Sequence, residues 1–236
     1  MAVRATVLRA AFALLYRNRW LYWLASTIPF AGQWRVWQRR VLPRIVGERV
    51  LEVGCGTGTL LGDLVAAGYD CVAVDASPQM VAAARAALRR RRLDGARSRV
   101  THARAQGLPF ADGTFDTVIS TFPTPYIADE RAIREIARVL RPGGRLVVVV
   151  GASLLPTRAW LLPFVAIQRL AYGGSAARAA PAPRRGAGAP AITTVPVPQH
   201  RSGIPLEVAG LIRREECDRS AFWEVYVTIG DKPHGS

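Results

Sequence analysis

The sequence contains little lysine and little cysteine, and each shortage carries information. Lys232 is the only lysine among 32 basic residues, which indicates the arginine preference of a GC-rich coding sequence. Cys55, Cys71 and Cys217 are too few and too scattered for a disulfide framework or a metal cluster. We therefore expect a cytoplasmic protein of a reducing compartment that has no metal site.

Long uncharged apolar segments are also scarce. The N-terminal region lacks the uninterrupted apolar core of a signal peptide, because four arginines interrupt it: Arg4, Arg9, Arg17 and Arg19. The uncharged stretch 20–33 is too short to cross about 30 Å of hydrocarbon as a helix. Pro156 and Pro163 break the longer apolar stretch 146–168. We expect neither a secretion signal nor a membrane-spanning helix.

Acidic residues are few relative to basic ones. Asp and Glu number 17 against 32 Lys and Arg, which gives a formal net charge of +15. Coding bias explains why arginine replaces lysine, but it does not explain the excess of positive charge. Nucleic acid, an anionic membrane face and an acidic substrate are partners that this charge would suit. A solvated basic surface without a partner is the alternative.

The most informative segment is a glycine-rich turn that follows an apolar strand and opens a helix. The residues from Val50 to Gly58 read Val-Leu-Glu-Val-Gly-Cys-Gly-Thr-Gly. Glycine accepts left-handed backbone and has no Cβ, so main-chain N–H groups can approach a ligand closely. A second apolar strand ends in Asp75, 17 residues after Gly58, where a βαβ unit of this kind places a carboxylate on ribose hydroxyls. The pattern indicates a nucleotide-type cofactor.

Together with four further segments, this turn resembles the class I methyltransferases that use S-adenosylmethionine. The segments follow in the family's order: Asp75–Met80, Gly107–Asp116, Thr117–Phe122 and Arg138–Leu146. With the turn they cover roughly residues 47–151. The alternative is a Rossmann-like domain that binds another nucleotide.

The resemblance implies an α/β, Rossmann-like methyltransferase fold: a seven-stranded, mostly parallel sheet with one antiparallel strand, helices on both faces and an N-terminal helical cap. We expect the cap over residues 1–46 and the cofactor-binding domain over 47–236. The expected strands lie near 49–53, 70–74, 99–103, 115–121 and 145–150, and the expected helices near 58–67, 78–92 and 129–140. An insertion over about 152–200 is expected to be helical in 154–172 and a mobile loop in 173–200, before two last strands in 206–215 and 222–229.

The cap combines apolar positions at helical spacing, in 3–16 and 33–46, with arginine and tryptophan. In the family such a segment folds over the cofactor and substrate pocket. We favour tryptophans that fill the core of this lid. The alternative is an amphipathic surface that makes peripheral contact with an anionic membrane.

The resemblance also implies a set of cofactor contacts. The methionine part would lie against the glycine-rich turn, with Glu52 near its ammonium group. Asp75 would accept hydrogen bonds from the ribose hydroxyls. The remaining contacts implied are Gly54, Cys55, Gly56 and Gly58 in the turn, Ala76 and Met80 beside the adenine, and Ala105, Gln106 and Thr121.

One position departs from the family pattern. Arg104 stands where the family usually has an acidic residue that accepts from the adenine amino group, and a guanidinium offers no acceptor. We hypothesise that Gln106 or a main-chain carbonyl replaces it. The alternatives are that Arg104 points away, or that cofactor binding is weakened.

The methyl acceptor is less determined. The segment Thr121–Tyr126 occupies the family's acceptor-facing place but lacks the motifs of enzymes that methylate nucleic-acid bases, so we do not expect nucleic acid as the partner. Tyr126 is the candidate acceptor-pocket residue, and packing under the lid is its alternative role. His102, within a strand, is interpreted as structural.

We therefore expect an S-adenosylmethionine-dependent methyltransferase that acts on a small, lipophilic acceptor, in the group resembling quinone, sterol and phospholipid methyltransferases. The alternatives are a noncatalytic binding protein with a methyltransferase-like fold, and a basic RNA-associated protein. The sequence leaves the oligomeric state open.

Overall fold

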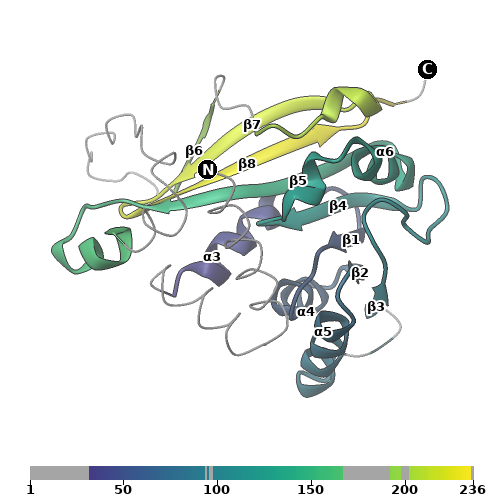
Figure 1. Ribbon diagram of the computed structural model, residues 1–236, viewed down its shortest axis with the longest axis horizontal. Coiled ribbons are helices and arrows are strands. Elements are labelled where there is room, and N and C mark those ends of the chain that lie inside the picture. The colour runs from purple at the N-terminus through teal and green to yellow at the C-terminus, as the bar shows by residue number, and fades with distance from the viewer. Residues whose placement is uncertain (1–31, 94, 96–97, 167–191, 198–201, 235–236) are drawn as a thin grey trace, which may run out of the picture.

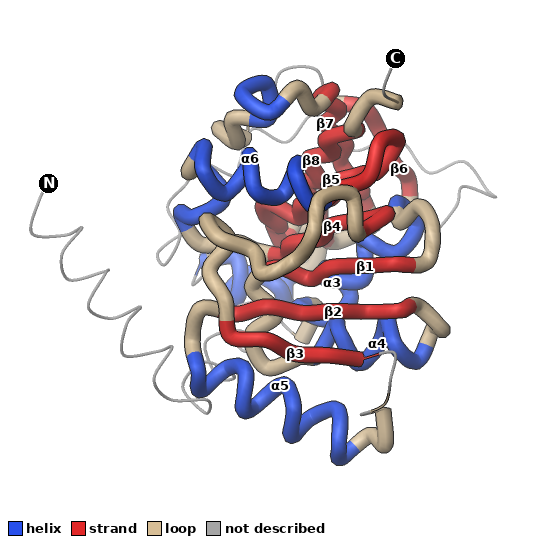
Figure 2. The backbone as a smooth tube through the Cα atoms, turned by 90° about the vertical axis from the view of Figure 1, so that its right-hand side faces the viewer, coloured by secondary structure: helices blue, strands red, loops and turns tan. Residues whose placement is uncertain are grey.

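The computed structural model describes residues 32–93, 95, 98–166, 192–197 and 202–234. In these residues eight strands form one sheet, in the order β3-β2-β1-β4-β5-β8-β7-β6 (Figures 1 and 2). The strands are β1 Arg49–Val53, β2 Asp70–Asp75, β3 Ser98–His102, β4 Phe115–Thr121, β5 Leu140–Leu154, β6 Thr193–Pro196, β7 Ile212–Arg219 and β8 Trp223–Asp231. The pairs among β1 to β5 are parallel, whereas β8 runs antiparallel to β5, β7 to β8 and β6 to β7.

The helical elements lie between these strands. The α-helices are α3 Trp34–Gln38, α4 Thr59–Ala66, α5 Pro78–Arg90 and α6 Glu130–Val139, and the 3₁₀ turns are η1 Arg39–Arg44, η2 Pro125–Ala128, η3 Ala159–Leu161 and η5 Leu206–Ala209. Ser77 caps α5, and Pro78 occupies its first position. The alternating strands and helices confirm the predicted Rossmann-like architecture.

The predicted strand count was wrong, because the described sheet has eight strands rather than seven. The additional strand is β6, which lies inside the segment predicted as a loop. Since β7 runs in the direction of β5, the antiparallel strands are two, β8 and β6. The glycine, alanine and proline content of 173–200 concealed a short β-branched run, Thr193-Thr194-Val195, that pairs with β7.

Other boundaries also differ from the prediction. The first of the two last strands begins at Ile212 rather than at 206, because residues 206–209 form η5. β5 extends to Leu154, and the predicted helical insertion contains η3 and further helical residues to 166. The cap helix expected in 3–16 and most of the loop expected in 173–200 lie outside the described residues. No helix in the described ranges is long and apolar enough to cross a membrane.

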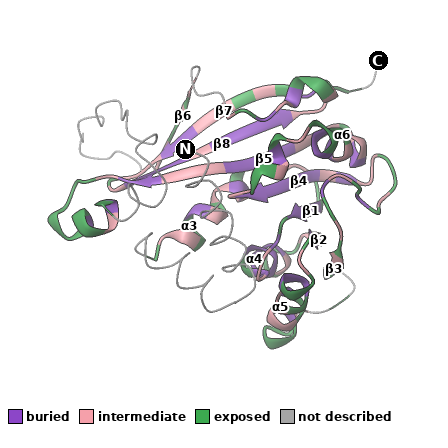
Figure 3. Ribbon diagram, viewed as in Figure 1, coloured by how far each residue is buried: buried purple, intermediate pink, exposed green. Residues whose placement is uncertain are grey.

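Two apolar cores lie on the two faces of the sheet. Val50 of β1 packs with residues of α4 and α5, whereas the neighbouring Leu51 packs with residues of α6 and η5. This alternation explains why the central parallel strands read as continuous apolar runs. Figure 3 shows β8 and β4 as largely buried strands within the sheet.

A buried ion-pair cluster joins the residues after α3 to the antiparallel edge of the sheet. Asp218 of β7 is fully buried and accepts from both terminal nitrogens of Arg44, at 2.9 and 3.0 Å. Arg40 Nε donates to the same carboxylate at 2.6 Å, and Thr194 Oγ1 donates at 2.5 Å from β6. Burial opposes ionisation, but the hydrogen bonds from Arg44 and Arg40 outweigh it and lower the pKa of Asp218.

We predict that Asp218→Asn lowers the free energy of unfolding by about 3 kcal/mol, because it removes the carboxylate that Arg40 and Arg44 share and leaves the buried Arg44 with Glu216 alone. Urea denaturation at pH 7 measures the loss. Since the pKa of Asp218 is depressed in the folded state, its stabilising effect is present above about pH 4 and disappears as the pH falls below that.

The matched control is Arg134→Ala, which breaks an exposed ion pair with Glu130 on α6. This control should cost less than about 0.5 kcal/mol. Equal losses for the two variants would contradict a stabilising role for the buried cluster.

Candidate cofactor site

The candidate site lies where β1, β2 and β4 end. These strands pair in parallel, so their carboxyl ends meet at one edge of the sheet. The glycine-rich turn follows β1 at this edge and is joined to β2, because the N–H groups of Gly54 and Cys55 donate to the carbonyl of Val74 at 2.8 and 3.1 Å. The main chain of the turn is therefore fixed before any ligand binds.

The three predicted glycines all have left-handed backbone, with φ of +76° at Gly54, +53° at Gly56 and +74° at Gly58. A Cβ at Gly58 would lie 2.9 Å from the Cα of Ala84, and one at Gly54 would lie 2.8 Å from the hydroxyl of Tyr126. Two of these positions therefore also need glycine for the protein's own packing. At Gly58 the missing side chain lets the start of α4 approach α5.

Asp75, at the end of β2, connects the turn to the helix that follows. Its Oδ2 accepts from the N–H of Gly56 at 2.9 Å, and its Oδ1 accepts from the N–H of Ser77 at 2.8 Å. The side chain is half-buried, and each carboxylate oxygen keeps a second acceptor position. Asp75 is thus oriented to accept two further hydrogen bonds, as neighbouring ribose hydroxyls would donate.

Glu52 is buried at the end of β1, on the face that α4 covers. Only 2% of the residue is exposed, and its Oε2 has no hydrogen-bond partner among the described residues. Burial, followed by the carboxylates of Asp75 and Asp63, raises the pKa of Glu52 to about 8. A buried acceptor without a donor is the environment in which a ligand ammonium group would bind.

Asp63 lies on α4 behind Glu52 and is itself neutralised. Its carboxylate forms ion pairs with Arg35 of α3 at 2.5 Å, Arg39 of η1 at 3.0 Å and Arg91 after α5 at 3.1 Å. These guanidinium groups lower the pKa of Asp63 although burial opposes it. The ion pairs thus join the described part of the cap to two helices beside the glycine-rich turn.

The residues after β3 form a tight turn at the same edge. Arg104 is exposed, and its carbonyl accepts from the N–H of Gly107 at 3.1 Å. Ala105 is buried, whereas Gln106 is half-buried and donates from Nε2 to Asp129 Oδ2 at 3.2 Å. The imidazole of His102 lies 3.0 Å from the carbonyl of Ala76, which joins the ends of β3 and β2.

The other predicted residues divide between surface and interior. Ala76 is exposed, but Met80 is 2% exposed. Thr121 is buried at the end of β4 and accepts from Gln38 Nε2 of α3 at 3.3 Å. Tyr126 donates to the carbonyl of Val53 at 2.9 Å, so its hydroxyl lies beneath the glycine-rich turn.

Two features of this edge escaped the sequence prediction. Gln38, which contacts Thr121, gave no motif signal, and neither did the aromatic contact of Trp34 with Phe122 just after β4. Their position depends on how the cap packs over the sheet. The only hint in the sequence was the tryptophan content of the cap.

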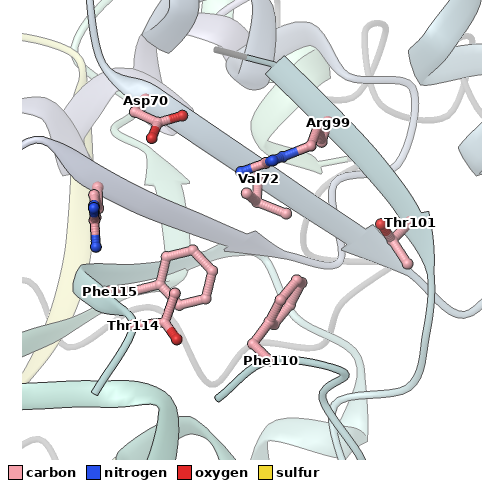
Figure 4. Close-up of a pocket in the computed structure, with 8 residues that line it drawn as sticks. Asp70, Val72, Arg99, Thr101, Phe110, Thr114 and Phe115 are labelled. Atoms are coloured by element: carbon pink, nitrogen blue, oxygen red, sulfur yellow. The ribbon is translucent and has the colours of Figure 1, made fainter. Parts of the chain in front are cut away.

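A cleft of about 490 Å³ lies over one face of β1, β2 and β3, away from the glycine-rich turn (Figure 4). Arg49 and Asp70 line it and begin β1 and β2, whereas Gly54 and Asp75 lie at or beyond the ends of these strands. The edge-to-face rings of Phe110 and Phe115 and the side chains of Val72, Arg99, Thr101 and Thr114 complete its lining. The cleft contains none of the predicted cofactor residues.

We predict that Glu52→Gln makes stability less sensitive to pH. Because the pKa of Glu52 is raised in the folded state, the wild-type protein loses stability as the pH rises from about 4.5 through 8, where the buried carboxylate ionises. The glutamine variant has no such loss, so its advantage should reach a few kcal/mol by pH 9. Urea unfolding at pH 5, 7 and 9, with exposed Glu130→Gln as control, measures the difference. Parallel pH profiles for wild type and Glu52→Gln would be incompatible with this pKa.

Comparison with known proteins agrees with this geometry. Residues 51–148 match a family described as a methyltransferase domain. Demethylmenaquinone methyltransferases from Corynebacterium efficiens and Beutenbergia cavernae are 40% and 41% identical over 133 and 131 residues, which is 54% of this chain and 53% and 52% of theirs. The chain therefore spans about half the length of these relatives.

A solved structure shares the fold over a longer range. The crystal structure of a SAM-dependent methyltransferase from Methanosarcina mazei superposes with a TM-score of 0.52 and covers 83% of this chain and 98% of that one. At 18% sequence identity, this likeness concerns the fold alone. The match to a methyltransferase domain covers the glycine-rich turn, Asp75 and the strands up to β5, so the candidate cofactor site lies within the matched residues.

Proposed function

We propose that this protein binds S-adenosylmethionine and transfers its methyl group to a small, lipophilic, quinone-like acceptor. The observation that carries the first part is the preformed turn, in which Asp75 holds the N–H groups of Gly56 and Ser77. The similarity to demethylmenaquinone methyltransferases over half of their length supports the class of acceptor.

The residues of this edge suit the chemical groups of the cofactor. Glu52 offers an unpartnered buried oxygen to the ammonium group, and Asp75 offers two acceptor positions to the ribose hydroxyls. Bound here, S-adenosylmethionine would supply a methyl group on a sulfonium, which is already a good leaving group. The protein then has to align the acceptor atom with the methyl carbon and exclude water.

Gln106 is proposed to recognise the adenine in place of the missing acidic residue. Its Nε2 donates to Asp129, which fixes the amide and leaves the carbonyl oxygen as an acceptor for the adenine amino group. Arg104 is exposed and its guanidinium has no acceptor atom, so its side chain takes no part in this recognition.

Two other interpretations of the chain are less well supported. Arg104 is the one observation that favours a noncatalytic binding protein. RNA binding was considered because of the charge, but more than half of the described arginines form ion pairs with carboxylates of the same chain, including Arg44, Arg138 and Arg213. Most of the described arginines therefore have acidic partners within the protein, which weakens the argument from charge for an RNA partner.

We expect calorimetric titration to detect binding of both S-adenosylmethionine and S-adenosylhomocysteine. Asp75→Asn should weaken binding about tenfold or more. The substitution replaces the carboxylate, which accepts from the N–H of Gly56 and would accept from the ribose hydroxyls, by a neutral amide. The control is Asp70→Asn at the other end of the same strand, which should bind like the wild type. If neither compound bound, the cofactor assignment would be refuted and the noncatalytic alternative would be favoured.

We further predict that Gln106→Ala weakens binding of S-adenosylmethionine about fivefold to tenfold, through loss of one hydrogen bond to the adenine. Arg104→Ala serves as the neighbouring control and should leave affinity unchanged. If Gln106→Ala bound as well as wild type, another group would have to recognise the adenine.

A further inference from the structure

An exposed apolar turn follows β5, and we call its residues 156–164 the apolar turn. Among the described residues only three large apolar side chains are more than half exposed, and two of them lie here: Trp160 at 56% and Leu162 at 53%. The ring of Trp160 meets that of Phe164 edge to face, with centroids 6.5 Å apart. Large apolar side chains that are exposed next to each other mark an interaction surface.

Core contacts fix the orientation of this turn. Leu161, between the two exposed residues, is fully buried, and Val165 is 5% exposed; both belong to the apolar core on the α4 and α5 face of the sheet. Thr157 Oγ1 donates at 2.9 Å to a carbonyl in the turn between β7 and β8. Because Leu161 faces inward, Trp160 and Leu162 on either side of it face solvent.

The strand β5 carries the apolar turn beyond the edge where the candidate cofactor site lies. Thr121, the last residue of β4, pairs with Val149 of β5, and β5 continues in the same direction to Leu154. Figure 1 shows this extension of β5 with the helical turn projecting at its end, and Figure 3 shows that turn as largely exposed. A narrow projection can enter the interface of a bilayer, whereas contact between two proteins needs a broad face of about 800 Å² from each partner.

The charge near the turn is positive. Arg158 is exposed and forms no ion pair with any other residue that the structure describes. Residues 136–206 contain nine arginines and no acidic residue. On the neighbouring strands β7 and β8, the carboxylates of Asp218 and Glu224 are buried and paired with arginines, so they do not counter this charge at the surface. Positive charge beside exposed apolar side chains is complementary to anionic lipid headgroups.

We propose that the apolar turn docks the protein on an anionic lipid bilayer. Trp160 and Leu162 enter the region between headgroups and acyl chains, and Arg158 contacts lipid phosphates. The described tryptophans of the cap form no such surface, because Trp37 is fully buried and Trp34 is half-buried against another ring. Docking through this turn would bring the carboxyl edge of the sheet close to the bilayer. The inference goes beyond the proposed function and does not rest on it.

The test measures binding of the protein to vesicles by flotation. One set of vesicles is phosphatidylcholine alone, and the other also contains phosphatidylglycerol. We expect the wild type to bind the anionic vesicles, and the double variant Trp160→Ser, Leu162→Ser to bind them about tenfold or more weakly, because it lacks the apolar area that enters the bilayer. Arg158→Gln should weaken binding to the anionic vesicles about fivefold and leave the weaker binding to phosphatidylcholine unchanged.

A second measurement places one side chain within the bilayer. Brominated acyl chains quench the fluorescence of a tryptophan that lies among them. Vesicles of brominated anionic lipid should therefore reduce the emission of the wild type more than that of Trp160→Phe. The phenylalanine variant keeps an apolar side chain at this position and should still bind.

The matched control is Ile212→Ser, because Ile212 is another exposed apolar residue, at 61%, but lies at the opposite end of the sheet. It begins β7 and pairs through Asp231 of β8 with Arg145, far along β5 from the apolar turn. This variant should bind both kinds of vesicle like the wild type. Thermal unfolding of each variant checks that the fold persists.

No binding of wild type to anionic vesicles, equal binding by the double serine variant, or equal quenching in Trp160→Phe would each overturn the proposal. A dimer that forms without lipid and that the double serine variant loses would also overturn it, since the turn would then contact a second copy of the chain; sedimentation velocity detects this. These measurements need neither cofactor nor methyl acceptor, so their outcome is independent of the titrations that test the proposed function.

Discussion

The carboxylate of Asp75 accepts hydrogen bonds from two main-chain N–H groups, and the geometry of the site depends on them. One comes from Gly56 in the glycine-rich turn and the other from Ser77 just before α5. The turn after β1 and the helix after β2 are therefore held by one side chain at the edge where the parallel strands end. Because both bonds leave acceptor capacity on the oxygens, the same group can position the turn and still bind a ribose.

Several ion pairs in this protein join segments that are distant in the sequence. Asp63 is paired with arginines from α3, η1 and the end of α5, and Asp218 is paired with Arg40 and Arg44. Both carboxylates are buried. The arginines around Asp63 remain largely exposed to solvent, whereas Arg40 and Arg44 are mostly buried, so removal of Asp218 should be the more costly of the two changes. These clusters hold residues 34–44 against the sheet, and α3 within this segment meets Thr121 and Phe122 at the carboxyl end of β4. The excess of arginine in the sequence thus has a structural use in this part of the chain.

Local patterns predicted the parallel core of the fold well. The strand 49–53, the glycine-rich turn and the helix capped by Ser77 all have signals within a few neighbouring residues, and the structure has them at these places. The strand β6 was missed because its four residues sit in a segment whose composition is typical of loops. Its pairing with β7 and the bond from Thr194 to Asp218 are long-range effects that no local pattern contains.

In the candidate site, too, some features could be predicted from the sequence and others depend on long-range packing. Glycines and acidic residues at strand ends could be named from the sequence, but the double hydrogen bond of Asp75 and the unpartnered oxygens of Glu52 and Gln38 depend on packing. Gln38 lies 83 residues from Thr121 in the chain, and only the placement of the cap brings the two together.

A crystal structure of the protein with S-adenosylhomocysteine would test the central claim most directly. The account predicts electron density for the ligand over the glycine-rich turn, with its ribose hydroxyls within hydrogen-bond distance of Asp75. Density for the ligand in the cleft lined by Arg49 and Arg99 instead, with none over the turn, would contradict it.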